Sequence, residues 1–295
     1  MPVPLIQPDW PAPAHVRAAF TTRAGGVSTA PFDSLNLGDH VNDRAADVAK
    51  NRHQLQQALG ARAVFLKQVH GVDVAAVNLG TPDGLQADAC TTQQRGVACT
   101  VMVADCLPVF FTDRAGSFVA AAHAGWRGLL GQGGVGVLES VYQSFMPVVQ
   151  AFTAQTAINS VAPVSTSTSA PTSTSASSPH DIMAWLGPCI GPTQFEVGAE
   201  VRDVFVAQQA GSHQYFEKLP MPSGAPDKFL ANMPALARAR LLSLGLTQIY
   251  GNDGSAAWCT VGNPSRFFSH RRDAARLGST GRMAACIWLA DGVVD

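Results

Sequence analysis

The stretch ADCLPVFFTDRAGSFVAAAHAGWRG, residues Ala104–Gly128, decides the fold that we expect for this chain of 295 residues. Two of its segments, Pro108–Thr112 and Phe118–Ala122, have the length and the apolar composition of buried β-strands. Cys106 precedes them and lies just after a third apolar run, Val97–Val103. The stretch therefore predicts neighbouring buried strands with a thiol at a strand end.

Two histidines occupy similar places in the pattern. His123 follows the predicted strand Phe118–Ala122, and His70 closes an upstream apolar run, Phe65–Val69. The ends of separate strands can meet at one edge of a sheet, so we expect both imidazoles to converge with the Cys106 thiol. Such a convergence is what a metal site or a Cys/His catalytic pair requires.

The composition is that of an ordinary globular protein. Hydrophobic residues make up 46% of the chain, and the formal net charge is −1. The chain has no excess of positive charge that would attract nucleic acid or an acidic membrane. No apolar run is long enough to predict a transmembrane helix. The Pro-rich N-terminus lacks the pattern of a signal peptide, and the six cysteines have no regular spacing. We therefore expect a cytoplasmic protein with reduced thiols.

Strands and helices are expected to alternate along the chain, which indicates a mixed α and β protein. The predicted helices run from Asn42 or Asp43 to just before Gly60, from Leu129 to Phe145, from Gly198 to Gln208 and from Asn232 to Gly245. Further strands are predicted at Arg17–Thr22, Phe65–His70, Val72–Val77, Ile182–Leu186, Gln248–Tyr250, Phe267–His270 and Met283–Leu289.

A segment at about 152–179 differs from the rest of the chain. It contains the run VAPVSTSTSAPTSTSASSP, which is low-complexity Ser, Thr, Ala and Pro. Such a composition buries too little apolar surface to offset the entropy of ordering, so a disordered insertion is expected. We interpret it as an insertion within one domain rather than as a linker between two.

Three interpretations of the Cys and the two His are open at this point. Thiolate and imidazole suit zinc, and three protein ligands leave a fourth position for water or substrate. Copper accepts the same ligands. Alternatively, Cys106 is a nucleophile with His123 as its base and Asp105 or Asp88 orienting the imidazole. In the third interpretation the three residues are structural only. The metal site is favoured.

Arginines point to an anionic substrate, because arginine binds phosphate and carboxylate in a bidentate manner. Arg127 is adjacent to the expected site and is the main candidate. Arg23 lies in a glycine-rich turn, and Arg52 lies on the apolar stripe of a predicted helix, where pairing with a carboxylate is favoured over binding a substrate anion. Arg271, Arg272 and Arg282 flank the last predicted strands.

Several motifs together resemble one known family. They are, in chain order, FTTRAGGVS, PFDSLNLGDHV, NRHQL, LKQVHG, ADAC, ADCLPV, AAAHAGWRGL, GPCIGP with FEVG, CT, FFSHRR and TGRMA. The chain resembles the YfiH-like family, also called the laccase-domain or multicopper polyphenol oxidoreductase family, from about Phe20 to Ile287. His270 departs from the family pattern, which often has an aromatic residue there.

The resemblance implies a fold and an activity. The implied fold is α+β, a single domain over residues 1–295 with mixed sheets in an α/β/β/α layered arrangement. The implied ligands of Zn²⁺ are His70, Cys106 and His123. Members are described as purine nucleoside phosphorylases that act on adenosine, inosine and methylthioadenosine, with adenosine deaminase activity. Copper-dependent polyphenol oxidation and editing of a peptidoglycan precursor by a cysteine-type amide hydrolase are the alternatives. A four-copper oxidase is excluded chemically, because eight histidines without an HxH pair cannot supply its ligands.

Roles for the remaining residues follow as hypotheses from this resemblance. Cys106, Asp105 and Arg127 are expected to act in catalysis, with Arg127 binding phosphate. Arg23, Asn36, Arg52 and Asp88 are the candidate substrate-binding residues. Asp105 or Asp88 is expected to contact a ribose hydroxyl or to protonate the leaving base. The expected partners are a purine nucleoside and phosphate, with no nucleic acid and no membrane, and the protein is expected to be a monomer or a small homo-oligomer.

Overall fold

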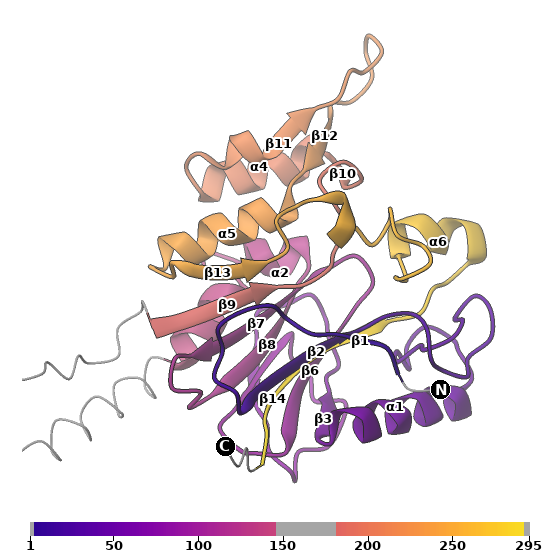
Figure 1. The fold of residues 1–295 in the computed structure, drawn as a ribbon. Coiled ribbons are helices and arrows are strands. Elements are labelled where there is room, and N and C mark those ends of the chain that lie inside the picture. The colour runs from indigo at the N-terminus through magenta and orange to yellow at the C-terminus, as the bar shows by residue number, and fades with distance from the viewer. Residues whose placement is uncertain (1–2, 146–180, 292–295) are drawn as a thin grey trace, which may run out of the picture.

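The structure is a computed structural model that describes residues 3–145 and 181–291. The Ser/Thr-rich insertion predicted at about 152–179 lies outside the described residues. Two mixed sheets form the body of the molecule, and a smaller sheet extends beyond them (Figure 1). None of the described helices is long and apolar enough to cross a bilayer.

The larger sheet is built around strands from the stretch Ala104–Gly128. Its strand order is β13-β9-β7-β8-β5-β4, with β7 antiparallel to both β8 and β9. The strands are β13 (Gln248–Gly251), β9 (Ile182–Leu186), β7 (Leu107–Asp113), β8 (Val119–Ala124), β5 (Ala89–Thr92) and β4 (Val74–Ala76). Every residue of β7 and β8 is buried, as their continuous apolar sequences predict.

The second sheet has five strands in the order β1-β2-β14-β6-β3. The strands are β1 (Leu5–Ile6), β2 (Val16–Thr21), β14 (Met283–Leu289), β6 (Val97–Val103) and β3 (Arg62–Phe65). The first and last thirds of the chain meet here, because β14 pairs with both β2 and β6. Strand β6 then leads through Ala104–Cys106 into β7, so the chain crosses between the sheets at the predicted thiol.

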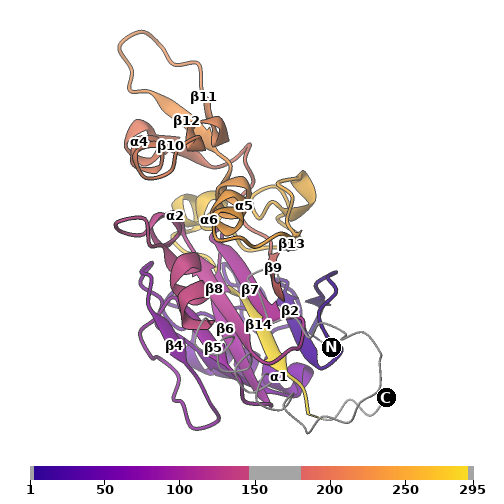
Figure 2. The same ribbon diagram turned by 90° about the vertical axis from the view of Figure 1, so that its left-hand side faces the viewer.

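The two sheets pack face to face between layers of helices (Figures 1 and 2). Side chains such as Phe110 and Trp185 meet Val101 and Ala285 in the central core. Helices α2 (Trp126–Leu130), α4 (Ala199–Gln208) and α5 (Met233–Ser243) contribute to the core on the outer face of the larger sheet, and α1 (Ala45–Leu59) covers the five-stranded sheet. The predicted α/β/β/α layering is therefore confirmed.

A third sheet projects beyond this sandwich together with α4 (Figure 2). It contains β10 (Glu196–Gly198), β12 (Lys228–Ala231) and β11 (Phe216–Lys218), preceded by the 3₁₀ turn η2 (Ser212–Tyr215). The sequence predicts a loop over His213–Lys228, which is wrong at its two ends. These strands are short and only partly buried, so they carry little of the apolar periodicity on which the prediction depends.

Three further predictions of local structure are wrong. The segment predicted as a strand at Phe267–His270 is loop followed by helix α6 (His270–Leu277), which Ser269 caps by accepting a hydrogen bond from the Arg272 N–H at 3.1 Å. The predicted helix Leu129–Phe145 is broken, because Gly131 has a φ of 66° and ends α2 before a second helical segment begins at residue 137. Strand β3 ends at Phe65, so His70 lies in a loop rather than at the end of that strand.

A candidate metal centre in an arginine-lined pocket

The three predicted ligands converge. The side-chain ligand atoms of His70, Cys106 and His123 all lie within 4.8 Å of one another, and the Cys106 Sγ lies 3.8 Å from the His70 Nε2. Among the described residues this is the one group of three or more His, Cys, Asp or Glu side chains close enough to hold a metal ion.

The convergence depends on how the chain places each ligand. Cys106 lies in the crossover between β6 and β7, and His123 is the second-last residue of β8, paired with Pro108 across the sheet. His70 adopts a left-handed backbone conformation with a φ of 60°, which is uncommon for a residue other than glycine. That conformation turns the His70 loop back toward the other two ligands.

Asp88 connects the loop that carries His70 to the buried side chain of His123. Its carboxylate is fully buried and accepts hydrogen bonds from the backbone N–H groups of Val69, His70 and Gly71 at 3.0, 2.9 and 2.7 Å. It also lies 2.8 Å from the His123 Nδ1. A proton on Nδ1 leaves the His123 Nε2 lone pair free, which is the arrangement usual for a metal-binding histidine with a carboxylate partner.

Two glycines of the HAGWRG motif allow the close approach of these parts. A Cβ added at Gly125 would lie 2.7 Å from the His70 Cδ2 and 3.2 Å from the Cys106 Sγ. One added at Gly128 would lie 2.8 Å from the Gly71 carbonyl oxygen. Both positions therefore require the absence of a side chain if the His70 loop is to pack against α2.

The electrostatics of the metal-free cluster favour a thiolate. Burial alone would raise the pKa of Cys106, but the charge of His123 and hydrogen bonds from both histidines lower it to about 6. Burial would likewise lower the pKa of His123, but the Cys106 thiolate and Asp88 raise it to about 9. Burial opposes ionisation of Asp88 too, but the hydrogen bond and charge of His123 and the hydrogen bonds from the Gly71 and Val69 backbone N–H groups together outweigh it, so the pKa of Asp88 lies below its usual value.

The cluster opens into a pocket of about 420 Å³. One part of its lining is apolar and aromatic, with Trp126, Phe195 and Met233. The charged part holds Arg127, Arg271 and Arg282, and none of these three forms an ion pair with a carboxylate in the part of the chain that the structure describes. The pocket therefore combines metal ligands, a surface for a flat ring and uncompensated positive charge.

Asp105 lines the pocket, but its carboxylate is occupied by protein groups. Its Oδ1 accepts a hydrogen bond from the Thr260 hydroxyl at 2.6 Å, and its Oδ2 accepts from the Ser269 hydroxyl at 3.1 Å and from the Arg271 N–H at 2.6 Å. Asp105 thus attaches the crossover that carries Cys106 to the beginning of α6. Asp88, although central to the cluster, is not part of the pocket lining.

Like Asp88, the other three predicted substrate-binding residues lie outside the pocket lining. Arg23 pairs with Asp33 at 3.2 Å, and Arg52 pairs with Asp39 at 3.2 Å, which agrees with the favoured structural interpretation of Arg52. Asn36 is fully buried, and its Oδ1 accepts a hydrogen bond from the Arg282 N–H at 2.8 Å. Of the arginines assigned to the site, Arg23, Arg52 and Arg127, the structure brings Arg127 to the pocket, and of the three that flank the last predicted strands, Arg271 and Arg282 also line it.

Several lining residues were not predicted as site residues. They are His40, Gln68, Phe195, Met233, His270, Arg271 and Arg282. Arg282 and His40 belong to the TGRMA and PFDSLNLGDHV motifs, so the motifs themselves carried a signal. Phe195 likewise belongs to the FEVG motif, whereas nothing in the local pattern around Met233 indicates that it approaches a thiol 127 residues earlier in the chain.

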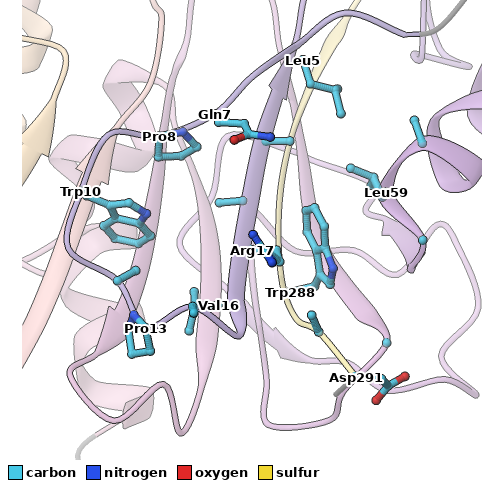
Figure 3. Close-up of a pocket in the computed structure, with 18 residues that line it drawn as sticks. Leu5, Gln7, Pro8, Trp10, Pro13, Val16, Arg17, Leu59, Trp288 and Asp291 are labelled. Carbon is cyan, nitrogen blue, oxygen red and sulfur yellow. The ribbon is translucent and has the colours of Figure 1, made fainter. Parts of the chain in front are cut away.

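A second pocket, of about 520 Å³, lies beside the β1–β2 connection. Figure 3 shows Trp10 and Trp288 on either side of β2, with Arg17 and Asp291 nearby. Those two residues are its only charged lining residues, and its lining contains no His or Cys. The pocket at the His–Cys–His cluster is therefore the better candidate for an active site.

Comparisons with known proteins agree with this site. The sequence matches the family described as multi-copper polyphenol oxidoreductase laccase over residues 17–157 and 160–290. The chain belongs to this laccase-domain, YfiH-like family. It is 45% identical to purine nucleoside phosphorylase PA4543 of Pseudomonas aeruginosa, over 97% of this chain and 98% of that protein. Purine nucleoside phosphorylase YfiH of Escherichia coli is 43% identical over the same shares.

Solved structures of relatives share the fold. Neisseria meningitidis protein NMB0706 is 40% identical, with a TM-score of 0.72 over 97% of this chain and 99% of that chain. Bacillus licheniformis YfiH is 28% identical, with a TM-score of 0.73 over 93% and 92%. The mixed sheets described above are thus the fold of this family.

Proposed function

We propose that this protein is a zinc-dependent purine nucleoside phosphorylase that acts on adenosine, inosine and methylthioadenosine and also deaminates adenosine. The observation that carries the proposal is the His–Cys–His cluster, which faces a pocket with aromatic side chains and three arginines that have no carboxylate partner within residues 3–145 and 181–291. The names of the P. aeruginosa and E. coli relatives support the substrate class. The protein would work in the cytoplasm, as a monomer or a small homo-oligomer.

The donor set fits zinc. A tetrahedral zinc ion with ordinary bond lengths would hold a sulfur and a nitrogen ligand about 3.6 Å apart. The Cys106 Sγ and His70 Nε2 are 3.8 Å apart, and the orientation of His123 is fixed by Asp88. Zinc held there by His70, Cys106 and His123 would supply a Lewis acid beside the substrate. Copper is possible on the same ligands, and metal analysis of the purified protein separates the two.

In phosphorolysis, a phosphate oxygen bonds to C1′ of the ribose while the bond from C1′ to the purine N9 breaks. The electron pair of that bond leaves with the purine, which takes up a proton, so the products are ribose 1-phosphate and the free base. Trp126 and Phe195 offer aromatic surfaces for the purine. Arg127, with the other pocket arginines, supplies the positive charge that attracts the phosphate and offsets its negative charge.

The two aspartates are proposed to act mainly by positioning. Asp88 holds the His70 loop and orients His123, and Asp105 holds the Cys106 crossover against α6. Because both Asp105 oxygens already accept hydrogen bonds, contact with a ribose hydroxyl would be an additional bond rather than its main role. Arg23, Asn36 and Arg52 would act at a distance, through the loops that they hold.

Chromatography of adenosine incubated with purified zinc-loaded protein tests the function. With inorganic phosphate, we expect adenine and ribose 1-phosphate, and without phosphate we expect inosine only. The Cys106→Ala variant should lose bound zinc and both products. Formation of adenine without phosphate, or of no product from any of the three nucleosides, would contradict the proposal.

A second candidate function is a cysteine-type amide hydrolase that edits a peptidoglycan precursor. It is favoured by one observation, the line of Cys106, His123 and Asp88, in which the carboxylate orients the imidazole at 2.8 Å. Removal of metal separates the candidates, because a thiolate nucleophile should remain active in a chelator. Retained amide hydrolysis by the metal-free protein would favour the hydrolase.

A further inference from the structure

Arg282 is the pocket arginine with unused hydrogen-bond donors. Its Nη1 donates to the carbonyl oxygens of Thr280 and Gly281 at 3.0 and 3.3 Å. Its Nε and Nη2 make no hydrogen bond to any residue that the structure describes, and no carboxylate there lies within ion-pair distance. The side chain nevertheless lines the pocket, so the free edge of the guanidinium is available to a ligand.

The surroundings of Arg282 make an anion its natural partner. Burial lowers the pKa of Arg282, whereas the nearby Cys106 and Asp105 raise it. The negative charge of Asp105 is already shared among three protein donors, and that of Cys106 would be taken by a bound metal ion. A largely desolvated guanidinium without a paired charge is costly to hold, and a bound anion removes that cost.

The other two pocket arginines are engaged differently. Arg127 is exposed and lies over the Trp126 ring at 4.3 Å. Arg271 directs both Nη1 and Nη2 to the Glu196 carbonyl oxygen at 3.1 Å, beside the Phe195 ring. These arginines belong to the side of the pocket formed by α2, α6 and the approach to β10. Arg282 belongs to the other side, directly before β14 of the five-stranded sheet.

The loop before α1 holds Arg282 in place. The Asn36 Oδ1 accepts a hydrogen bond from the backbone N–H of Arg282. A Cβ added at Gly38 would lie 2.7 Å from the Arg282 Cγ. His40 follows in the same loop and also lines the pocket. Burial and the charge of Arg282 both lower the pKa of His40. The Asp39 carboxylate lies 3.5 Å from the His40 Nδ1, so a neutral His40 that keeps its proton on Nδ1 has its Nε2 free to accept a hydrogen bond from the hydroxyl of a hydrogen phosphate ion.

We propose that Arg282, with His40 beside it, forms the phosphate subsite of this pocket, and that Asn36 and Gly38 are its positioning residues. The inference rests on the proposed phosphorylase function and specifies where its phosphate binds. Phosphate at Arg282 leaves the aromatic side of the pocket, with Trp126, Phe195 and Met233, for the purine. The metal ligands line the same pocket as both of these parts.

Substitution of Arg282 tests this subsite directly. In Arg282→Gln we expect the KM for phosphate, measured with inosine, to rise about 10- to 100-fold, because charge-assisted hydrogen bonds are lost. The KM for inosine should change less than threefold. Arg282→Lys should recover part of the phosphate affinity. Gly38→Ala keeps the charge but displaces the side chain, and we expect it to raise the KM for phosphate on the order of tenfold.

Arg114→Gln is the matched control, because it removes the same charge from an exposed position at the opposite end of β7. Its KM for phosphate should equal that of the wild type. Calorimetric titration of the zinc-loaded proteins with inorganic phosphate gives a second readout that needs no turnover. Heat of binding should be present in the wild type and in Arg114→Gln and lost in Arg282→Gln.

These measurements distinguish failure of the proposed phosphate subsite from failure of the proposed phosphorylase function. If the wild type forms ribose 1-phosphate and Arg282→Gln keeps a KM for phosphate within twofold, the subsite is wrong and the function stands. The subsite is also wrong if Arg127→Gln abolishes phosphate binding while Arg282→Gln does not. If no nucleoside is cleaved but Arg282 is still required for phosphate binding, the function is wrong and the anion site stands.

Discussion

Replacement of Asp88 by asparagine should weaken both the fold and the metal site. Each carboxylate oxygen accepts two hydrogen bonds, one pair from the N–H groups of Val69 and Gly71 and the other from the His70 N–H and the His123 Nδ1. An asparagine side chain has the same shape but one acceptor oxygen, so two of the four donors lose their partner in either orientation of the amide.

The magnitude follows from that count. An unsatisfied buried donor costs about 1 to 3 kcal/mol, so Asp88→Asn should lower the free energy of unfolding by about 2 to 6 kcal/mol. That is a large part of the stability of a typical domain, which is about 5 to 15 kcal/mol. Loss of the partner that orients a ligating histidine should also reduce zinc affinity about 10- to 100-fold.

Urea denaturation of the metal-free protein and competition with a zinc chelator measure the two effects. Asp113→Asn is the matched control, because Asp113 is also buried and accepts hydrogen bonds from the Ser117 N–H and hydroxyl at 2.7 and 2.6 Å. It lies at the far end of the seven-residue strand β7, about 20 Å along the strand from the ligands. Asp113→Asn should lose stability and keep zinc affinity. Unchanged zinc affinity in Asp88→Asn would show that Asp88 does not position the metal ligands.

Three other predictions concern the same cluster. Gly125→Ala should reduce zinc affinity at least about tenfold, because the added methyl group would lie 2.7 Å from the His70 Cδ2; equal affinity in chelator competition would be inconsistent with this packing. In metal-free protein, alkylation of Cys106 by iodoacetamide should rise with a midpoint near pH 6, as its lowered pKa requires, and zinc should suppress it; a midpoint above pH 8 would contradict the thiolate. The pKa of Asp88 is lowered in the folded state, so ionised Asp88 stabilises the fold above its ordinary pKa. This stabilisation is lost as the pH falls through the lowered pKa of the folded state. In Asp88→Asn, the free energy of unfolding should therefore fall less steeply toward acid pH.

The strands of the body could be predicted from the sequence because their burial makes them continuous apolar runs. The predicted strands at Val97–Val103, Ile182–Leu186 and Met283–Leu289 have the observed bounds of β6, β9 and β14. Helix α5 was predicted from local chemistry, since the Asn232 side chain accepts a hydrogen bond from the Ala235 N–H at the position expected of a cap.

Helix α6 was missed for the opposite reason. Its sequence HRRDAARL has almost no apolar face, and Asp273 is its one buried residue. The helix is held by polar bonds: the Arg271 backbone N–H and the Ser269 hydroxyl donate to Asp105, and the Arg272 backbone N–H donates to the Ser269 hydroxyl oxygen. A pattern of hydrophobic residues cannot reveal an element that is positioned by hydrogen bonds to a distant loop.

The metal ligands were predictable and the rest of the pocket was not. His70, Cys106 and His123 are residue types with a specific chemistry, so their convergence could be expected even though the strand assigned to His70 was wrong. The roles of arginines depend on their neighbours instead. Arg52 and Arg282 are equally basic in the sequence, and only the structure shows that Arg52 faces Asp39 whereas Arg282 faces the pocket.

X-ray absorption spectroscopy of the purified protein at the zinc edge tests most directly whether the three residues form a metal centre. We expect one zinc ion per chain with one sulfur ligand at about 2.3 Å and two imidazole nitrogens at about 2.0 Å. The sulfur contribution should vanish in Cys106→Ala. A zinc environment without sulfur, or a protein that binds no transition metal while Cys106, His70 and His123 are intact, would contradict the account.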